Sequence, residues 1–175
     1  MLFTCNTTGT IQSKVISTDK GNNRSRHILS NPSGHTIYKY LLDGGIIKNS
    51  PPDIQKCDYI IEADKTNENH AFLIELKGKD VTHALDQLAG TVKLFTNPET
   101  CKEFQDAFQG TLDGYVIHLR VIATKNDKAK NILQPHERAL LDVIKRLRSR
   151  YRIKFDPKEL IIRQAGNPHQ VTDSI

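Results

Sequence analysis

The segment from residues 57 to 77 constrains the fold of this chain most strongly. Two apolar runs, "CDYIIEA" and "AFLIELK", flank a tip rich in Asn, Asp and Lys, which is typical of an antiparallel hairpin. We predict strands at about 57–63 and 71–77. Glu75 and Lys77 stand at the end of the second apolar run, which is unusual for a strand that serves only the core.

The rest of the sequence predicts an α/β fold, a mixed β-sheet sandwiched by helices. Asp80 is the expected N-cap of a helix whose apolar residues recur at 81, 84, 85, 88, 92 and 95. A second amphipathic helix is entered at Pro135 and extends to Tyr151. The other predicted elements are an N-terminal β-hairpin within 3–18, a polar basic loop at 19–26, a short helix between Ser33 and Gly44, a brief strand from Ile46 that the Pro51-Pro52 pair breaks, and strands at 114–124 and 159–164.

The chain has 175 residues, the size of one domain. We divide it into an N-terminal hairpin and basic loop (1–32), a core (33–124) and a C-terminal helix and strand (125–175). Basic residues outnumber acidic ones by 25 to 20, which mildly favours an anionic partner. The three cysteines show no zinc-binding spacing. No signal segment and no apolar run of about 20 residues occurs, so we expect a cytoplasmic protein without a membrane partner.

Glu75 and Lys77 share one face of their predicted strand, because side chains alternate between faces. Asp58 joins them if it lies opposite either residue, which requires an even number of loop residues, such as a loop centred near residues 66–67. Adjacent strands lie about 4.8 Å apart, so the Asp58 and Glu75 carboxylates would reach one ion. Two carboxylates and a backbone carbonyl are hard oxygen ligands that suit Mg²⁺, which takes waters and phosphate oxygens as its remaining ligands.

The stretch "KCDYII…FLIELKGKDVTHALDQL" resembles the core of the PD-(D/E)XK nuclease superfamily, the restriction-endonuclease-like fold. The resemblance covers well over half of the chain and implies an αβββαβ core, here with the N-terminal hairpin as an extension. It implies that Asp58 takes the aspartate position, that Glu75 and Lys77 take the E-x-K positions, and that the Leu76 carbonyl completes the metal shell. Gln87 resembles a glutamine that several branches, including RecB-like nucleases, place near the site, and is a fourth candidate catalytic residue.

The sequence also departs from the pattern of that family. The Pro-Asp dipeptide ends at Asp53, which leaves Asp53 as an alternative metal ligand; we favour Asp58 because it immediately precedes "YII". Many relatives supply a glutamate from the first helix. None is present here, so His35 or Asp43 would substitute, or that ligand is missing. Thr91 stands four residues after the glutamine, where the glutamine-to-tyrosine pattern has a tyrosine.

Several cations are candidates for contact with nucleic-acid phosphates, which would make binding depend on salt. The run "KRLRSRYRIK" at 145–154 has six cations and no acid, although such a run is often only the solvated face of a helix. The candidate nucleic-acid-binding residues are Arg24, Arg26, Lys79, Arg146 and Arg150.

We therefore expect a nuclease that depends on Mg²⁺, or on Mn²⁺ in its place, and hydrolyses phosphodiester bonds, with DNA as the first choice of substrate. Lys77 would orient the attacking water and balance negative charge. Three alternatives remain open: a non-catalytic member of the fold that binds nucleic acid or a protein, a ribonuclease, and a plain surface salt bridge between Glu75 and Lys77. Because many relatives cut both strands as dimers, a homodimer is expected by analogy.

Overall fold

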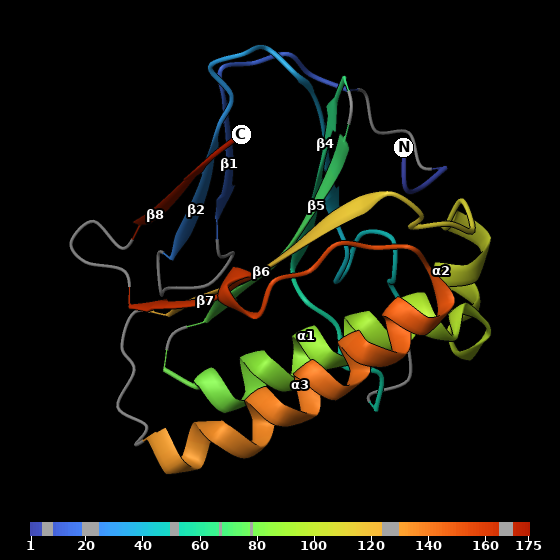
Figure 1. Cartoon of the computed structure of the whole chain (residues 1–175), viewed down its shortest axis with the longest axis vertical. Helices are drawn as coiled ribbons and strands as arrows, with labels where there is room; N and C mark the ends of the chain where they lie inside the picture. The colour runs from blue at the N-terminus through green and yellow to red at the C-terminus, as the bar shows by residue number, and fades with distance from the viewer. Residues whose placement is uncertain are drawn as a thin grey trace.

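A five-stranded mixed sheet forms the centre of the computed structural model, which describes residues 1–4, 9–18, 25–49, 53–66, 68–77, 79–123, 130–164 and 170–175. The strand order is β3-β4-β5-β6-β7 (Figure 1). The first three strands are antiparallel neighbours, whereas β6 runs parallel to both β5 and β7. The strands are β3 (Thr36–Leu41), β4 (Tyr59–Lys65), β5 (Glu68–Lys77), β6 (Tyr115–Ala123) and β7 (Leu160–Gln164).

The hairpin predicted from the two apolar runs is confirmed as β4 and β5. Lys65 pairs with Glu68 across a two-residue connection at 66–67, and Tyr59 pairs with Ile74. The number of loop residues is therefore even, as the proposed register requires. Both strands extend further toward the tip than predicted, because the polar residues 64–65 and 68–70 remain in the hydrogen-bonded ladder.

Helices cover one face of this sheet. In α1 (Val81–Thr96), all six apolar positions predicted to face the core are buried, and the Asp80 side chain caps the helix by accepting a hydrogen bond from the His83 N–H. The long helix α3 (Lys130–Arg150) packs beside α1 (Figure 1). It begins five residues before Pro135, because Leu133, seven residues from Leu140 on the same face, is also buried in the core.

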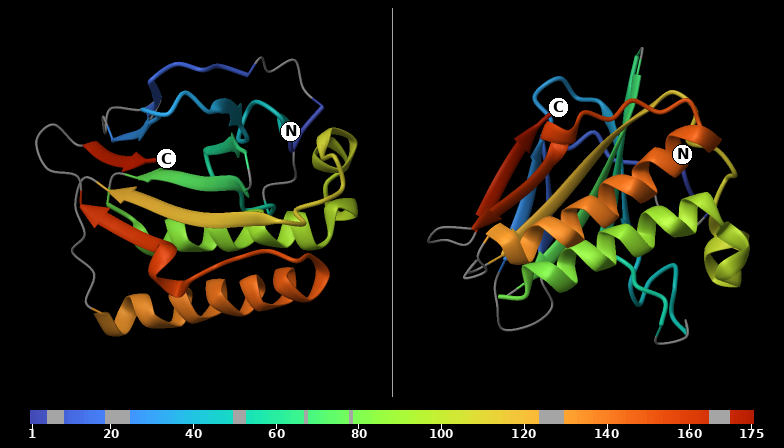
Figure 2. Two further views of the ribbon diagram at one scale, coloured as in Figure 1. Left: turned by 45° about the horizontal axis from the view of Figure 1, so that its top comes forward. Right: turned by 60° about the horizontal axis from the view of Figure 1, so that its bottom comes forward.

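The other face of the sheet is covered by a second sheet and not by helices, which corrects the predicted helical sandwich (Figure 2). Its strands are β1 (Lys14–Thr18), β2 (Arg26–Ser30) and β8 (Gln170–Ser174), in the order β1-β2-β8. β1 pairs antiparallel with β2, and β2 pairs parallel with β8. Residues near the two ends of the chain thus share one small sheet, whose Val15 and Leu29 pack on the central sheet.

Two predictions near the N-terminal half are wrong. The expected helix between Ser33 and Gly44 is strand β3, which pairs with β4 from Thr36 opposite Asp64 to Leu41 opposite Tyr59. Its β-branched and aromatic residues favour a strand, whereas the start and stop signals that suggested a helix belong to turns. The hairpin expected within 3–18 joins β1 to β2 instead. The segment from Ile46 forms an isolated bridge at Ile47, and the Pro51-Pro52 pair lies outside the described residues.

Two small helical elements fill the region between α1 and β6 that the sequence left unassigned. They are a 3₁₀ turn, η1 (Pro98–Thr100), and α2 (Lys102–Ala107), and a further 3₁₀ turn, η2 (Pro157–Glu159), precedes β7. Within the described ranges, no helix is both long and apolar enough to cross a membrane.

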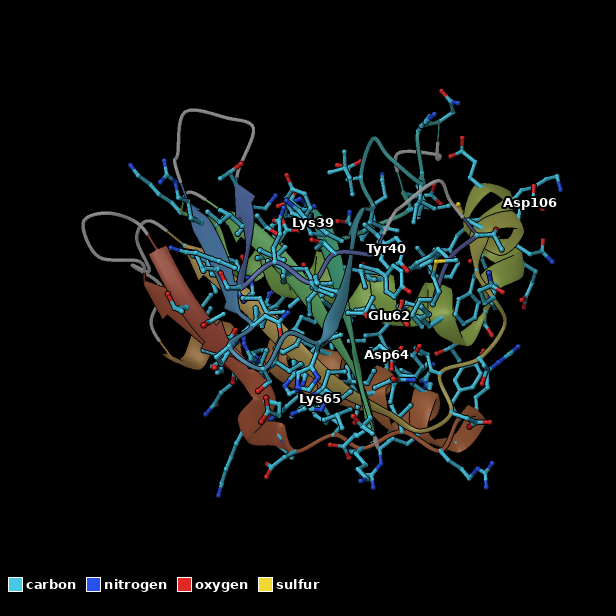
Figure 3. The ribbon with its side chains drawn as sticks, turned by 90° about the horizontal axis from the view of Figure 1, so that it is seen from above. Lys39, Tyr40, Glu62, Asp64, Lys65 and Asp106 are labelled. Atoms are coloured by element: carbon cyan, nitrogen blue, oxygen red, sulfur yellow. The ribbon has the colours of Figure 1, made fainter. Side chains whose placement is uncertain are left out.

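A buried carboxylate, Glu62 on β4, organises the helix-side core. It accepts hydrogen bonds from the Tyr40 hydroxyl at 2.8 Å, the Tyr115 hydroxyl at 2.6 Å and the Leu2 N–H at 2.7 Å. Figure 3 shows Tyr40 and Glu62 close together on their neighbouring strands. These contacts fasten the N-terminal segment to the sheet and satisfy the buried charge.

A chain of polar contacts ties the two sheets together on the opposite face. His27 of β2 and Arg120 of β6 both donate to Asp173 of β8, at 2.8 and 2.7 Å. Arg120 also contacts Glu159, which accepts from His118, and His118 in turn contacts His70 of β5 at 2.9 Å. Burial opposes the charge of Asp173, but the bonds from His27 and Arg120 hold its pKa below the usual range.

The partly buried His70 ring should make the fold sensitive to acid. Burial, with the neighbouring His118 and Lys65 charges, lowers the pKa of His70 to about 4. The unfolded chain takes up this proton near pH 6.5 and the folded chain only near pH 4, so stability falls as the pH falls between these values. The free energy of unfolding of the original protein should therefore fall between pH 7 and pH 4.5. We expect this fall to be about 1–3 kcal/mol smaller in His70→Gln, as measured by urea unfolding at the two pH values.

A matched control for this measurement is His83→Gln, at an exposed position on α1. It should keep the pH dependence of the original protein. The same pH slope in the His70 variant as in the original protein would contradict the assignment.

Candidate active site

Asp58 and Glu75 meet where β4 begins and β5 ends. The pairing of Tyr59 with Ile74, continued by one residue, places Asp58 directly opposite Glu75. The Asp58 N–H donates to Glu75 Oε2 at 3.1 Å, and the Leu76 N–H donates to Asp58 Oδ2 at 2.9 Å. Each strand therefore holds the carboxylate of the other through a backbone hydrogen bond, an arrangement that we call the carboxylate clasp.

Lys77 completes the group on the same face of β5. Its Nζ lies 3.1 Å from Glu75 Oε1, and its side chain is 25% exposed, whereas the Glu75 side chain is fully buried. The side chains of Glu75 and Lys77 therefore point to one side, as the strand alternation predicts. Lys77 forms the solvent side of the site, and Glu75 forms its floor.

The pair of acids is electrostatically unfavourable when both are ionised. Burial, followed by the Asp58 charge, raises the pKa of Glu75 to about 8, although Lys77 acts in the opposite direction. Burial and the Asp58 charge therefore favour the protonated form of Glu75 when no further cation is present. A divalent cation between the carboxylates would replace that proton, because it favours the ionised form of both acids.

The oxygen donors present fit Mg²⁺ through the chemistry of the set. Asp58, Glu75 and the Leu76 carbonyl supply hard oxygen atoms on two adjoining strands. Among the described residues, no group of three or more His, Cys, Asp or Glu side chains could hold a metal ion. A metal ion at this place would draw on these two carboxylates and the carbonyl, and waters would complete its coordination shell.

Asp53, the alternative ligand, lies elsewhere. It is exposed and lines a groove of about 760 Å³ between the 53–55 segment, α1 and α3. A second groove of about 350 Å³ lies between α3 and the segment that carries Phe155 and Pro157. Neither groove is lined by the carboxylate clasp or by Lys77.

The residues proposed to replace a first-helix glutamate do not join the clasp in the described contacts. Asp43 forms an ion pair with Lys56 at 3.2 Å. His35 uses its backbone N–H to bond the Asn31 side chain at 2.9 Å. With β3 in place of the expected helix, the described part of the chain has no helix before the hairpin that could carry such a ligand.

Gln87 contacts the backbone beside the site. Its Nε2 donates to the Lys56 carbonyl at 3.0 Å, and its Oε1 is buried without a hydrogen-bond partner among the described residues. Thr91, which sequence reasoning treated only as a missing tyrosine, accepts the Cys57 N–H at 2.8 Å. The spacing of Gln87 and Thr91, four residues apart on one helix face, was the available signal.

The candidate nucleic-acid-binding cations separate into two groups. Lys79 follows the end of β5, and Arg26 follows Ser25, whose hydroxyl donates to the Lys77 carbonyl at 3.1 Å. Arg150 instead donates to the Thr96 carbonyl at 2.7 Å, at the far end of α1, about 24 Å along a 16-residue helix. Arg146 lines the larger groove toward that far end. Arg24 lies outside the described residues.

No family model matched the chain, and comparisons with curated proteins and with solved structures found no match either. The function therefore has to be argued from the geometry of the chain itself.

Replacing Glu75 should remove one contribution to the pH dependence of stability. The unfolded carboxyl ionises near pH 4.5 and the folded one near pH 8, so folding of the original protein weakens as the pH rises between these values. Glu75→Gln lacks this ionisation and should gain about 2–4 kcal/mol relative to the original protein between pH 5 and pH 8. Denaturant unfolding in the presence of a chelator measures the difference.

Glu99→Gln is the control for this prediction, because Glu99 is exposed on η1. It should follow the original protein at every pH. An unchanged pH profile in the Glu75 variant would show that the buried acid is already ionised at pH 5.

Proposed function

We propose that the protein is a Mg²⁺-dependent nuclease that hydrolyses phosphodiester bonds, with DNA as its substrate. The observation that carries the proposal is the carboxylate clasp, in which Asp58 and Glu75 lie opposite each other with the Lys77 ammonium 3.1 Å from Glu75. Two opposed acids and a lysine at the end of a hairpin form a donor set for a hard divalent cation next to a cationic side chain.

The residues of the chain would divide the work of hydrolysis. Asp58, Glu75 and the Leu76 carbonyl would hold Mg²⁺, which when bound acidifies water and neutralises charge on a phosphate. Lys77, at the solvent side, would orient the attacking water and stabilise the negative charge that develops at phosphorus. The buried position of Glu75 fixes its orientation, which limits the motion of the ligand set.

The order of elements supports the same proposal. An antiparallel meander, β3-β4-β5, is followed by α1 and by β6, which pairs parallel with β5. This order agrees with the βββαβ part of the PD-(D/E)XK core that the sequence resembles, without the leading helix. Fold likeness alone does not establish activity, so the clasp carries the argument.

Cleavage should depend on Lys77 and Glu75 and not on Asp53. We expect Lys77→Ala and Glu75→Gln to lower the rate of DNA cleavage by at least about 100-fold with Mg²⁺ or Mn²⁺, because Lys77→Ala removes positive charge beside the reacting phosphate and Glu75→Gln weakens the hold on the metal ion. Asp53→Asn, at the exposed rival carboxylate, should cleave like the original protein. Circular dichroism would verify that the variants are folded, and full activity in both site variants would refute the proposal.

A second candidate function is a non-catalytic member of this fold that binds nucleic acid or a protein. The observation that favours it is the burial of the site: Glu75 is fully buried and paired with Lys77, and no third acid joins the two carboxylates among the described residues. Titration calorimetry with Mg²⁺ and Mn²⁺ separates the two functions. Metal binding that Glu75→Gln abolishes supports the nuclease, whereas its absence in the original protein supports the non-catalytic function.

Nucleic acid is the proposed partner of the nuclease, and a homodimer is the proposed assembly for cutting two strands. Arg26 and Lys79 are the exposed cations that lie closest along the chain to the end of β5 and to Ser25, which contacts Lys77. Competition between DNA and RNA for binding, repeated at increasing salt, identifies the preferred substrate and the number of phosphate contacts.

A further inference from the structure

The segment that leads into Asp58 crosses α1 and is held there by three helix residues. Gln87 donates to the Lys56 carbonyl at 3.0 Å, and Thr91 Oγ1 accepts the Cys57 N–H at 2.8 Å. Gly90 lies against Gln55. Gly90 and Thr91 follow Gln87 by three and four residues, so the three residues form one stripe on the helix surface. We call this stripe the α1 clamp.

Gly90 is required for the close approach of the two backbones. A Cβ atom built at Gly90 would lie 2.1 Å from the Gln55 carbonyl oxygen and 2.7 Å from its carbonyl carbon. Since both atoms belong to the backbone, they cannot rotate away as a flexible side chain would. Any larger residue at this position must therefore push the 55–57 segment away from α1.

The Thr91 hydroxyl links the segment to the helix because it donates one hydrogen bond and accepts another. Its hydroxyl donates to the Gln87 carbonyl at 3.0 Å while it accepts the Cys57 N–H. The side chain is fully buried, so water cannot replace the lost partner of Cys57 if the hydroxyl is removed. The bond also fixes the residue immediately before Asp58.

We propose that Gln87, Gly90 and Thr91 are positioning residues that set the Asp58 carboxylate against Glu75. The inference rests on the proposed function, because it concerns the geometry of the same metal ligands. Asp58 contacts both the Glu75 side chain and the Leu76 N–H, and a ligand pair tolerates displacements of only about 0.5 Å. In this role Gln87 acts through the backbone of Lys56, which differs from the catalytic role expected from the sequence.

The first experiment measures Mn²⁺ affinity by calorimetry in two variants at one position. Thr91→Val keeps the shape of the side chain but removes the acceptor for the Cys57 N–H, and we expect the Mn²⁺ dissociation constant to rise at least about tenfold. Thr91→Ser retains the hydroxyl and should remain within about twofold of the original protein. Thr96→Val is the matched control, because the Thr96 hydroxyl bonds only the Val92 carbonyl within the same helix.

The second experiment does not depend on metal or nuclease activity. Amide hydrogen exchange in Thr91→Val should accelerate at least about tenfold at Leu76, whose N–H is held by Asp58, and at Asp58 itself. Amides in β3 and β6 should keep their protection. A purely structural role for Thr91 would instead accelerate exchange at all of these amides alike, and that outcome overturns the proposal, as does unchanged exchange at Leu76.

The two experiments also separate this inference from the proposed function. If the original protein binds no Mn²⁺, the proposed function fails, and the exchange at Leu76 alone decides whether the α1 clamp positions Asp58. Gly90→Ala gives an independent check, because alanine normally stabilises the middle of a helix. We expect it to accelerate exchange at Leu76; a variant with unchanged exchange there and greater stability would overturn the role of Gly90.

Discussion

Asp58 and Glu75 are held against each other by backbone hydrogen bonds at the open end of a β-hairpin, one position beyond the pair of Tyr59 with Ile74. Two ionised carboxylates placed in this way would repel each other, and the register of β4 and β5 imposes the arrangement. The same register buries Glu75 and places the Lys77 ammonium beside it. The sheet therefore holds the two acids together at one end, where burial and the Asp58 charge raise the pKa of Glu75.

A comparison with Glu62 shows why the clasp, and not every buried acid, is the functional candidate. Glu62 on β4 and Asp58, which immediately precedes β4, lie on the same face, four positions apart. Glu62 is satisfied by two tyrosine hydroxyls and a backbone N–H, so its surroundings suffice for a structural role. Glu75 faces a second acid and has its pKa raised to about 8. Perturbed acids of this kind concentrate at functional sites, although structural networks also perturb pKa values.

The hairpin and the helix that follows it were predictable from sequence because their signals are local. The even number of loop residues determined which residues oppose each other across the hairpin. The spacing of the apolar residues after Asp80 determined the buried face of α1. Strand β3 was misread because its identity depends on pairing with β4, whereas the glycines after it resemble helix stop signals. Strand β8 is short and polar, and only its pairing with β2 makes it a strand; tertiary context overrides local preference in both cases.

The same distinction explains what was missed at the site. A side chain on a strand has its direction fixed by alternation, so Asp58, Glu75 and Lys77 could be brought together by counting residues. Gln87 and Thr91 act on the backbone of a segment that is distant in sequence, and the close approach at Gly90 becomes evident only when that segment lies across the helix. The carboxylates could thus be located from the sequence, whereas the contacts that hold the strand entering the site required the structure. If a metal ion is held here, the accuracy of its site depends on those backbone contacts as much as on the two acids.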